Sequence, residues 1–254
     1  MSKGMLSIFR KREVEKADDP ASNKLAAVLY GPGARVTPPA VAAKPVPVVA
    51  DLPRAKLVFG FDGTASREAA WATSAALTDA LLAALPGQLD VALAVHGGNK
   101  LHTFTRFERD AGKLRDRAAG VRCKAGYTRL LDILMPVLES EGVGTVVYVG
   151  DVFEESEAHA RKLAALMGKR NIRPIVLHDT PFVDIEAGTG IFAEMASLTG
   201  GCVLPFNASA LPRLRELLSA VAVLAVGGTE MLTAKQETMP AARLLLEHLK
   251  GGKP

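Results

Sequence analysis

Short apolar runs alternate with amphipathic stretches along the chain from residue 56 onward. The apolar runs are typical of buried strands, and stretches in which leucine and alanine recur every three or four residues are typical of helices. This alternation predicts a doubly wound α/β fold, with a mostly parallel central sheet, helices on both faces and one antiparallel edge strand. The expected strands are 57–61, 89–95, 101–107 (the more polar edge strand), 145–149, 173–177 and 202–205. The expected helices are 68–85, 111–119, 129–141, 154–168, 191–198, 211–225 and 240–249.

The two ends of the chain depart from this pattern. Residues 1–54 contain six prolines between Pro32 and Pro53, and we expect a disordered, Pro-rich tail and linker there. A docking arm, anchored by apolar residues near the basic start of the chain, is the alternative for that segment. We therefore expect one α/β domain over residues 55–227, followed over 228–254 by a polar C-terminal tail with a short helix.

The net charge of +4 comes from the N-terminal tail. The first 50 residues hold eight Lys and Arg against four Asp and Glu, and the remaining residues hold 23 of each sign. This even balance, together with an aromatic content of only 5%, does not favour a nucleic-acid-binding surface.

Further features of the sequence bear on where the protein works. Cys123 and Cys202 are too few for a disulfide framework or a cysteine metal site, so we expect free thiols. The basic start of the chain is not followed by the apolar segment of a secretory signal. We find no run of about 18 apolar residues, the length that a membrane span needs. We therefore expect a cytoplasmic protein without a membrane span.

Residues with side-chain oxygens recur at the ends of predicted strands. Asp62, Thr64 and Ser66 directly follow the first strand. Thr128 comes 66 residues after Asp62, and Asp151 comes a further 23 residues on. Carboxyl ends of parallel strands meet at one edge of a sheet, where α/β proteins bind ligands. We expect these five side chains to share one site.

Two carboxylates and three hydroxyls favour a hard cation at this site. Mg²⁺ prefers oxygen ligands in an octahedral arrangement and usually keeps bound waters. Mn²⁺ or Ca²⁺ are alternatives, whereas Zn²⁺ prefers His or Cys, which these loops lack. The neutral hydroxyls would leave the ion electrophilic, so it would attract a carboxylate from a partner. The same residue types are common helix caps, so a fold with no bound metal is the alternative.

The sequence resembles the von Willebrand factor type A domain with its metal-ion-dependent adhesion site. That family has Asp-x-Ser-x-Ser in the first loop, Thr in the second and Asp in the third. Asp62, Ser66, Thr128 and Asp151 match this pattern, and Thr64 keeps a hydroxyl at the middle serine. The resemblance covers roughly the whole expected α/β domain, and it points to a bacterial cytoplasmic, stand-alone subgroup.

The resemblance also implies roles for these residues. The three hydroxyls would contact the metal directly or nearly so, and the two carboxylates would act directly or through bound waters. One departure is the third loop, where Val152 follows Asp151 although many family members have glycine there. Glu154 and Glu155 follow in the same loop, and their negative charge would either strengthen or crowd the site.

An enzyme is the competing interpretation. Phe61-Asp62-Gly63-Thr64 also resembles the first motif of the haloacid dehalogenase phosphatases, Asp-x-Asp-Gly-Thr after a strand. Gly60 stands at the nucleophile position, so no phospho-aspartyl intermediate can form. The sequence has no Gly-x-Ser-x-Gly elbow and no phosphate-binding glycine loop. His96 lies at a strand end, and we assign it no role. We therefore expect no catalytic residues.

The function that the resemblance implies is a metal-dependent protein-binding module. Its Mg²⁺ would capture an acidic residue of a partner protein. Bacterial members of this family often work beside an ATPase or a chaperone-like protein, so a protein of that kind is the expected partner.

Overall fold

The computed structural model describes residues 54–68, 71, 78–178, 189–205 and 211–251. By its contacts the chain divides into two units, Met1–Ala50 and Asp51–Pro254, and only the second contains described residues. The tail, linker and docking arm predicted for the N-terminal segment therefore lie outside the described residues.

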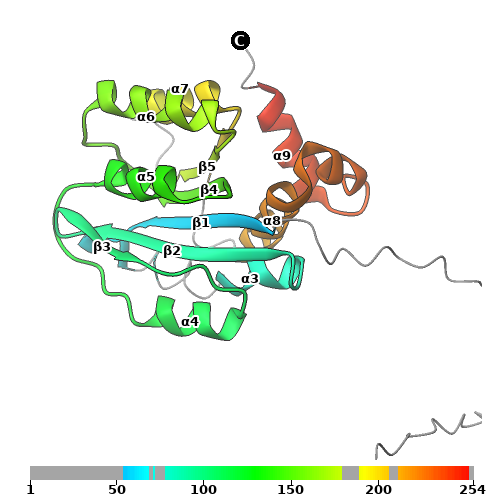
Figure 1. The fold of residues 1–254 in the computed structure, drawn as a ribbon, viewed down its shortest axis with the longest axis horizontal. Helices are drawn as coiled ribbons and strands as arrows, with labels where there is room; N and C mark the ends of the chain where they lie inside the picture. Colours follow the sequence, from blue (N-terminus) through cyan, green and yellow to red (C-terminus); the bar gives the residue numbers. More distant parts are fainter. Residues whose placement is uncertain (1–53, 69–70, 72–77, 179–188, 206–210, 252–254) are drawn as a thin grey trace, which may run out of the picture. The chain divides into compact units, whose positions relative to one another are not determined.

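Within the described residues, six strands form one sheet in the order β3-β2-β1-β4-β5-β6 (Figure 1). The strands are β1 (Ala55–Asp62), β2 (Leu89–Gly97), β3 (Lys100–Phe104), β4 (Val143–Gly150), β5 (Arg173–His178) and β6 (Cys202–Pro205). All neighbouring pairs are parallel except β2 and β3, which are antiparallel. The predicted sheet, mostly parallel with one antiparallel edge strand, is confirmed.

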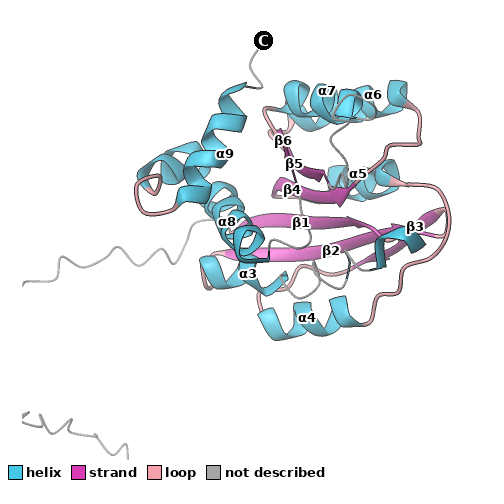
Figure 2. Ribbon diagram, turned by 180° about the vertical axis from the view of Figure 1, so that it is seen from behind, coloured by secondary structure: helices cyan, strands magenta, loops and turns pink. Residues whose placement is uncertain are grey.

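Helices cover both faces of this sheet (Figure 1 and Figure 2). One face carries α3 (Thr78–Ala84), α4 (Ala111–Ala119) and α8 (Leu211–Ala234), and α9 (Pro240–Gly251) packs against α8. The other face carries α5 (Leu130–Glu139), α6 (Glu157–Lys169) and α7 (Thr189–Thr199). A short 3-10 helix, η1 (Ala65–Arg67), directly follows β1 and carries part of the predicted site.

Strand β1 is buried on both of its faces. Leu57, Phe59 and Phe61 pack in the core cluster that includes α3, α4 and α8, whereas Val58 packs in the cluster that includes α5, α6 and α7. Each of these four side chains is at most 1% exposed. A strand covered by helices on both sides needs such a continuous apolar run. The core therefore holds the end of β1, and with it Asp62, in a fixed position.

Helix α8 is longer than predicted and bends at Gly228, whose φ of 63° lies in the left-handed region that favours glycine. The stretch Pro212–Ala234 has 23 residues and a mean hydropathy of 1.7, so by length and composition it is apolar enough to cross a membrane. The expectation of no stretch with this length and composition is therefore wrong, and the expectation of no membrane span stays a prediction. Of the apolar window, 44% is buried in the fold. Leu218 and Val221, for example, are fully buried in the core cluster, and core helices have the same composition.

The chain continues as packed structure beyond residue 227, where the sequence predicts the domain to end. Helix α9 begins at Pro240, as expected from the sequence. Its Ala242 and Leu245 are fully buried in the same core cluster as α8. The apolar residues of α9 recur at helical spacing, and this face has a partner in α8.

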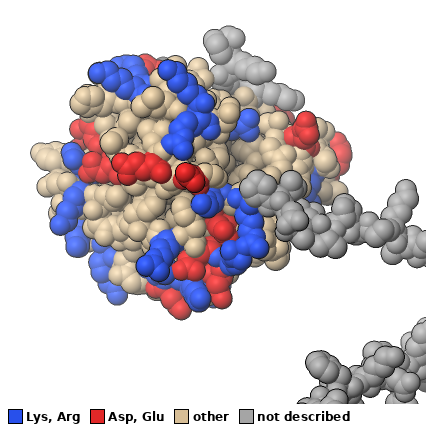
Figure 3. Space-filling view, in the orientation of Figure 1, with Lys and Arg blue, Asp and Glu red and all other residues tan. Residues whose placement is uncertain are grey.

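Acidic and basic side chains are interspersed on the face shown in Figure 3. Some acidic side chains form a short row across the middle of this face, and others lie among basic side chains lower on it. A nucleic-acid backbone favours a continuous basic surface, and the face in this view does not offer one.

Candidate metal centre

The site lies at the carboxyl ends of β1 and β4, which are neighbours in the sheet. From β1 the chain leads to β2 on one side, and β4 lies on the other side. The crevice between β1 and β4 is therefore a switch point of the kind where open α/β sheets bind ligands.

Asp62 is the last residue of β1, and it is fully buried. Its Oδ1 accepts a hydrogen bond of 2.9 Å from the backbone N–H of Thr64, which fixes the turn into η1. Its Oδ2 is also buried and has no hydrogen-bond partner within the described part of the chain. Burial raises the pKa of Asp62 to about 6, against the opposing effect of the Thr64 hydrogen bond. The negative charge of Asp151 raises this pKa further.

Thr128 is 2% exposed and lies two residues before α5. It forms a reciprocal pair with Glu154 of the third loop. The backbone N–H of Glu154 donates to Thr128 Oγ1 at 2.9 Å, and the backbone N–H of Thr128 donates to Glu154 Oε2 at 3.0 Å. These two bonds join the second and third loops and fix the position of the Thr128 hydroxyl.

Asp151 follows β4 and keeps 26% of its side chain exposed. His178 Nε2 lies 2.8 Å from the backbone carbonyl of Asp151, which attaches the third loop to the end of β5. The carboxylate pairs with the buried guanidinium of Arg67, and Nη1 lies 3.5 Å from Oδ2. Arg67 is the last residue of η1, so this ion pair connects the first loop to the third.

The five residues predicted to form the site all line one cavity of about 330 Å³. Thr64 Oγ1 and Ser66 Oγ lie 3.3 Å apart. The remaining lining residues are Ala65, Ala125, Gly126, Val152 and Glu154. Over the described ranges, no three His, Cys, Asp or Glu side chains lie close enough together to hold a metal ion. A cation in this cavity would therefore depend on the hydroxyls as well as on the carboxylates.

A buried histidine for which the sequence predicted no role lies next to Asp62. His96 Nδ1 is 3.8 Å from Asp62 Oδ1 and accepts a hydrogen bond of 3.3 Å from the backbone N–H of Arg129. The neutral ring then carries its proton on Nε2, which donates to the hydroxyl of Tyr148 at 2.9 Å. Burial, together with the smaller effects of the charges of His102 and Arg129, lowers the pKa of His96 to about 3. His96 therefore supplies no positive charge to balance Asp62.

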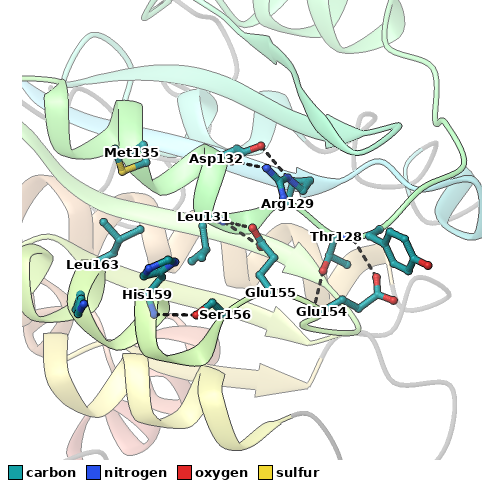
Figure 4. Close-up of a pocket in the computed structure, with 12 residues that line it drawn as sticks. Thr128, Arg129, Leu131, Asp132, Met135, Glu154, Glu155, Ser156, His159 and Leu163 are labelled. Carbon is teal, nitrogen blue, oxygen red and sulfur yellow. Dashed lines mark hydrogen bonds and ion pairs between the residues drawn. The ribbon is translucent and has the colours of Figure 1, made fainter.

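Glu154 and Glu155 both bind backbone N–H groups near the start of α5 (Figure 4). Glu155 accepts from the backbone N–H of Leu131 at 3.1 Å. Burial raises the pKa of Glu155 to about 7, against the lowering effect of the hydrogen bonds from Leu131 and Leu130. Helix α6 begins at Glu157, with Ser156 as its N-cap, rather than at Glu154 as predicted. The two glutamates lie outside α6 because their carboxylates bind the neighbouring loop and helix.

A second cavity of about 550 Å³ adjoins the first and shares Thr128 and Glu154 with it. It lies between the N-terminal ends of α5 and α6 (Figure 4). Its walls include Tyr127 and Met135, which are 68% and 50% exposed. Tyr127, which precedes Thr128, therefore exposes a large side chain beside the candidate site, whereas Met135 lies at the other end of the second cavity (Figure 4).

Comparison with known proteins gives matches among solved structures. No family model matches the chain, and no curated protein matches it. A von Willebrand factor type A protein from Catenulispora acidiphila superposes with a TM-score of 0.54 at 11% identity, covering 67% of this chain and 43% of that one. The SpRpn10 VWA domain gives 0.50 at 14% identity, covering 64% and 95%.

A third match is proximal thread matrix protein 1 from the mussel byssus, solved with a zinc-occupied MIDAS motif. It gives a TM-score of 0.52 at 14% identity and covers 66% of this chain. The fold is that of a von Willebrand factor type A domain. The matches span less than half of the Catenulispora and mussel proteins, at 43% and 46% of their lengths.

The residues of this von Willebrand A fold are chemically suited to a divalent cation. The orphaned oxygen is the deciding observation: Asp62 lines the cavity, and its Oδ2 is buried and lacks a hydrogen-bond donor among the described residues. A buried carboxylate without a donor is costly, and a bound cation would remove that cost. Oxygen donors from hydroxyls and carboxylates suit a hard ion such as Mg²⁺.

Proposed function

We propose that this von Willebrand A domain is a metal-dependent protein-binding module. Thr64, Ser66 and Thr128 would hold a divalent cation through their hydroxyls. Asp62 and Asp151 would complete the site, directly or through water. The buried Oδ2 of Asp62, which has no hydrogen-bond partner in the part of the chain that the structure describes, carries this proposal, because it needs a positive charge that His96 does not supply.

Magnesium is the proposed ion, with Mn²⁺ or Ca²⁺ as alternatives. The oxygen-only donor set favours these hard ions, and Mg²⁺ needs only a few protein ligands because it keeps bound waters. The mussel protein with zinc in its MIDAS motif supports metal binding by this fold. A bound ion of this kind acts as a Lewis acid toward an incoming oxygen ligand. We propose that this ligand is the carboxylate of an acidic residue on a partner protein.

The second cavity supports partner binding beside the metal. Tyr127 and Met135 expose apolar surface there, and exposed aromatic and methionine side chains are enriched at protein interfaces. Residues next to the partner's acidic residue would contact this surface. An ATPase or chaperone-like protein remains the proposed partner, and the cytoplasm the proposed location.

A carboxylate probe tests this function directly. We would titrate the full chain with a short peptide containing a single glutamate, and with the same peptide containing glutamine, in Mg²⁺ and in EDTA. The proposal predicts that only the glutamate peptide binds, that EDTA abolishes this binding, and that Asp62→Ala abolishes it in Mg²⁺. Asp116→Ala removes an exposed carboxylate on α4 and should leave binding unchanged. Equal binding of the two peptides would contradict the proposal.

A phosphatase is the less favoured alternative, and the surroundings of Gly60 argue against it. Gly60 lies within β1, paired with Ala94 and Tyr148 on the neighbouring strands. A Cβ at this position would lie 3.3 Å from the carbonyl oxygen of Val147 and 3.5 Å from the side chain of Ile133. The nucleophile position of that enzyme class therefore faces packed protein. We propose that the domain is not an enzyme.

A von Willebrand A scaffold without metal is the second alternative. One observation favours it: Asp151, one of the two carboxylates of the site, already has a positive partner in Arg67.

A further inference from the structure

Arg67 is a positive charge of the chain itself within the candidate metal site. Its side chain is only 7% exposed, and arginine is rarely buried unless it has a partner. It directly follows Ser66, and its Nη1 lies 3.5 Å from Asp151 Oδ2. The family pattern of oxygen ligands does not include this residue.

The guanidinium and a metal ion would both interact with the carboxylate of Asp151. The 3.5 Å separation is at the long end for a hydrogen bond, and a quarter of the Asp151 side chain remains exposed. The contact is therefore loose enough for Asp151 to turn toward a cation in the cavity that it lines. The guanidinium belongs to the buried 3-10 helix that follows β1. It would therefore stay near the carboxylate after Asp151 has rotated toward the cation.

We propose that Arg67 is an internal counter-cation that sets the metal affinity of the site. In the metal-free protein it balances Asp151. When a divalent ion binds, Arg67 competes for Asp151 and repels the ion across a region of low dielectric. The arginine therefore weakens metal binding and keeps the empty site from carrying two uncompensated carboxylates. This inference rests on the proposed metal-binding function.

Charge repulsion sets the expected size of the effect. A monovalent and a divalent cation that share one carboxylate lie a few ångströms apart, and their repulsion is only partly screened near a protein surface. Arg67→Met removes the charge and keeps a side chain of similar length. We expect it to bind metal roughly 10- to 100-fold more tightly than the wild type. Arg67→Lys keeps the charge and should bind within about threefold of the wild type.

The experiment is calorimetric titration of the full chain with MgCl₂ and with MnCl₂ at neutral pH. The variants are Arg67→Met, Arg67→Lys and the control Arg117→Met. Arg117, on α4, also forms an ion pair, with Glu108 at 2.7 Å, but it is more exposed than Arg67 and lines neither of the two cavities. A general effect of lost charge would appear in Arg117→Met as well, whereas the proposed effect appears only in Arg67→Met. Thermal unfolding with and without metal gives a second measurement: metal should raise the melting temperature of Arg67→Met more than that of the wild type.

The outcomes separate this inference from the proposed function. If the wild type binds metal and Arg67→Met binds equally or more weakly, Arg67 is not a competing cation and the proposed function stands. If only Arg67→Met binds metal, the inference holds and the native domain is a scaffold without metal. If neither binds metal, both are wrong.

If Arg67→Met does not fold, Arg67→Lys and Asp151→Asn decide. The inference is upheld if Arg67→Lys folds and binds metal within about threefold of the wild type, and if Asp151→Asn lowers the affinity by no more than about tenfold. Any other pair of results overturns it.

Discussion

The two carboxylates of the site lie in opposite environments. Asp62 is fully buried at the end of a core strand, with one oxygen bound to the backbone of its own turn and the other without a donor in the described structure. Asp151 is partly exposed and already paired with Arg67. The residue that most needs a cation is thus the more buried one, and the residue nearer to solvent has a positive partner within the chain. Asp62 is thus a fixed anion, whereas Asp151 is an adjustable one. We therefore expect the same substitution, aspartate to asparagine, to have different effects at the two positions.

The largest expected difference is in metal affinity. Asp62→Asn removes the charge of the more buried carboxylate, whose Oδ2 has no hydrogen-bond donor among the described residues, and we expect affinity for Mn²⁺ to fall by more than about 100-fold. Asp151→Asn removes a charge that Arg67 already shares, and we expect a fall of only about tenfold. Calorimetric titration of both variants measures the difference. Equal losses in the two variants would show that burial does not distinguish the carboxylates.

The next effect concerns the stability of the metal-free protein against pH. Burial raises the pKa of Asp62 from 3.8 to about 6. A raised carboxyl pKa leaves full stability below the unfolded value, and stability is lost as pH rises through the folded value. Between about pH 4 and pH 7 the wild type in EDTA should lose on the order of 3 kcal/mol relative to Asp62→Asn.

Urea unfolding of the wild type and of Asp62→Asn at several pH values would measure this loss. Saturating Mn²⁺ should remove it from the wild type, because a bound cation stabilises the ionised carboxylate. Parallel stability curves for the two proteins in EDTA would mean that Asp62 ionises without cost, and the buried oxygen would then be no argument for a metal.

The smallest effect concerns the support beneath Asp62. Tyr148→Phe removes the hydroxyl that pairs with His96 Nε2 and leaves a buried ring nitrogen without its partner. We expect a loss of about 1–2 kcal/mol in the free energy of unfolding. The ion pair of Asp151 with Arg67 should change little. Tyr127→Phe is the matched control, since that hydroxyl belongs to a side chain that is 68% exposed. If both variants are as stable as the wild type, the His96–Tyr148 pair does not hold the fixed half of the site.

Features of the fold and the site that depend on neighbouring residues could be predicted from the sequence, whereas contacts between residues far apart in the chain could not. β1 and Asp62 were predictable because a continuous apolar run ends in a turn motif. Thr128 was predictable because it directly precedes a recognisable helix, and Asp151 because it follows a recognisable strand. The ion pair of Arg67 with Asp151 joins residues 84 positions apart, and no local pattern reports it.

Two other features of the site were also missed because they depend on contacts between residues far apart in the sequence. The bond between His96 and Tyr148 spans 52 positions and forms only because β1 lies between their strands. The start of α6 was predicted too early because Glu154 and Glu155 are good helix formers. In the folded chain their carboxylates bind backbone N–H groups near the start of α5, so the helix begins only after Ser156.

Whether Asp62 holds a divalent cation can be measured through the binding of Mn²⁺. We would add one equivalent of Mn²⁺ to the full chain at neutral pH and follow the electron paramagnetic resonance signal of the free ion. We predict that the free-ion signal decreases with the wild type and with Asp116→Ala, and that it stays at its full height with Asp62→Asn. A free-ion signal that is the same with the wild type and with Asp62→Asn would contradict it.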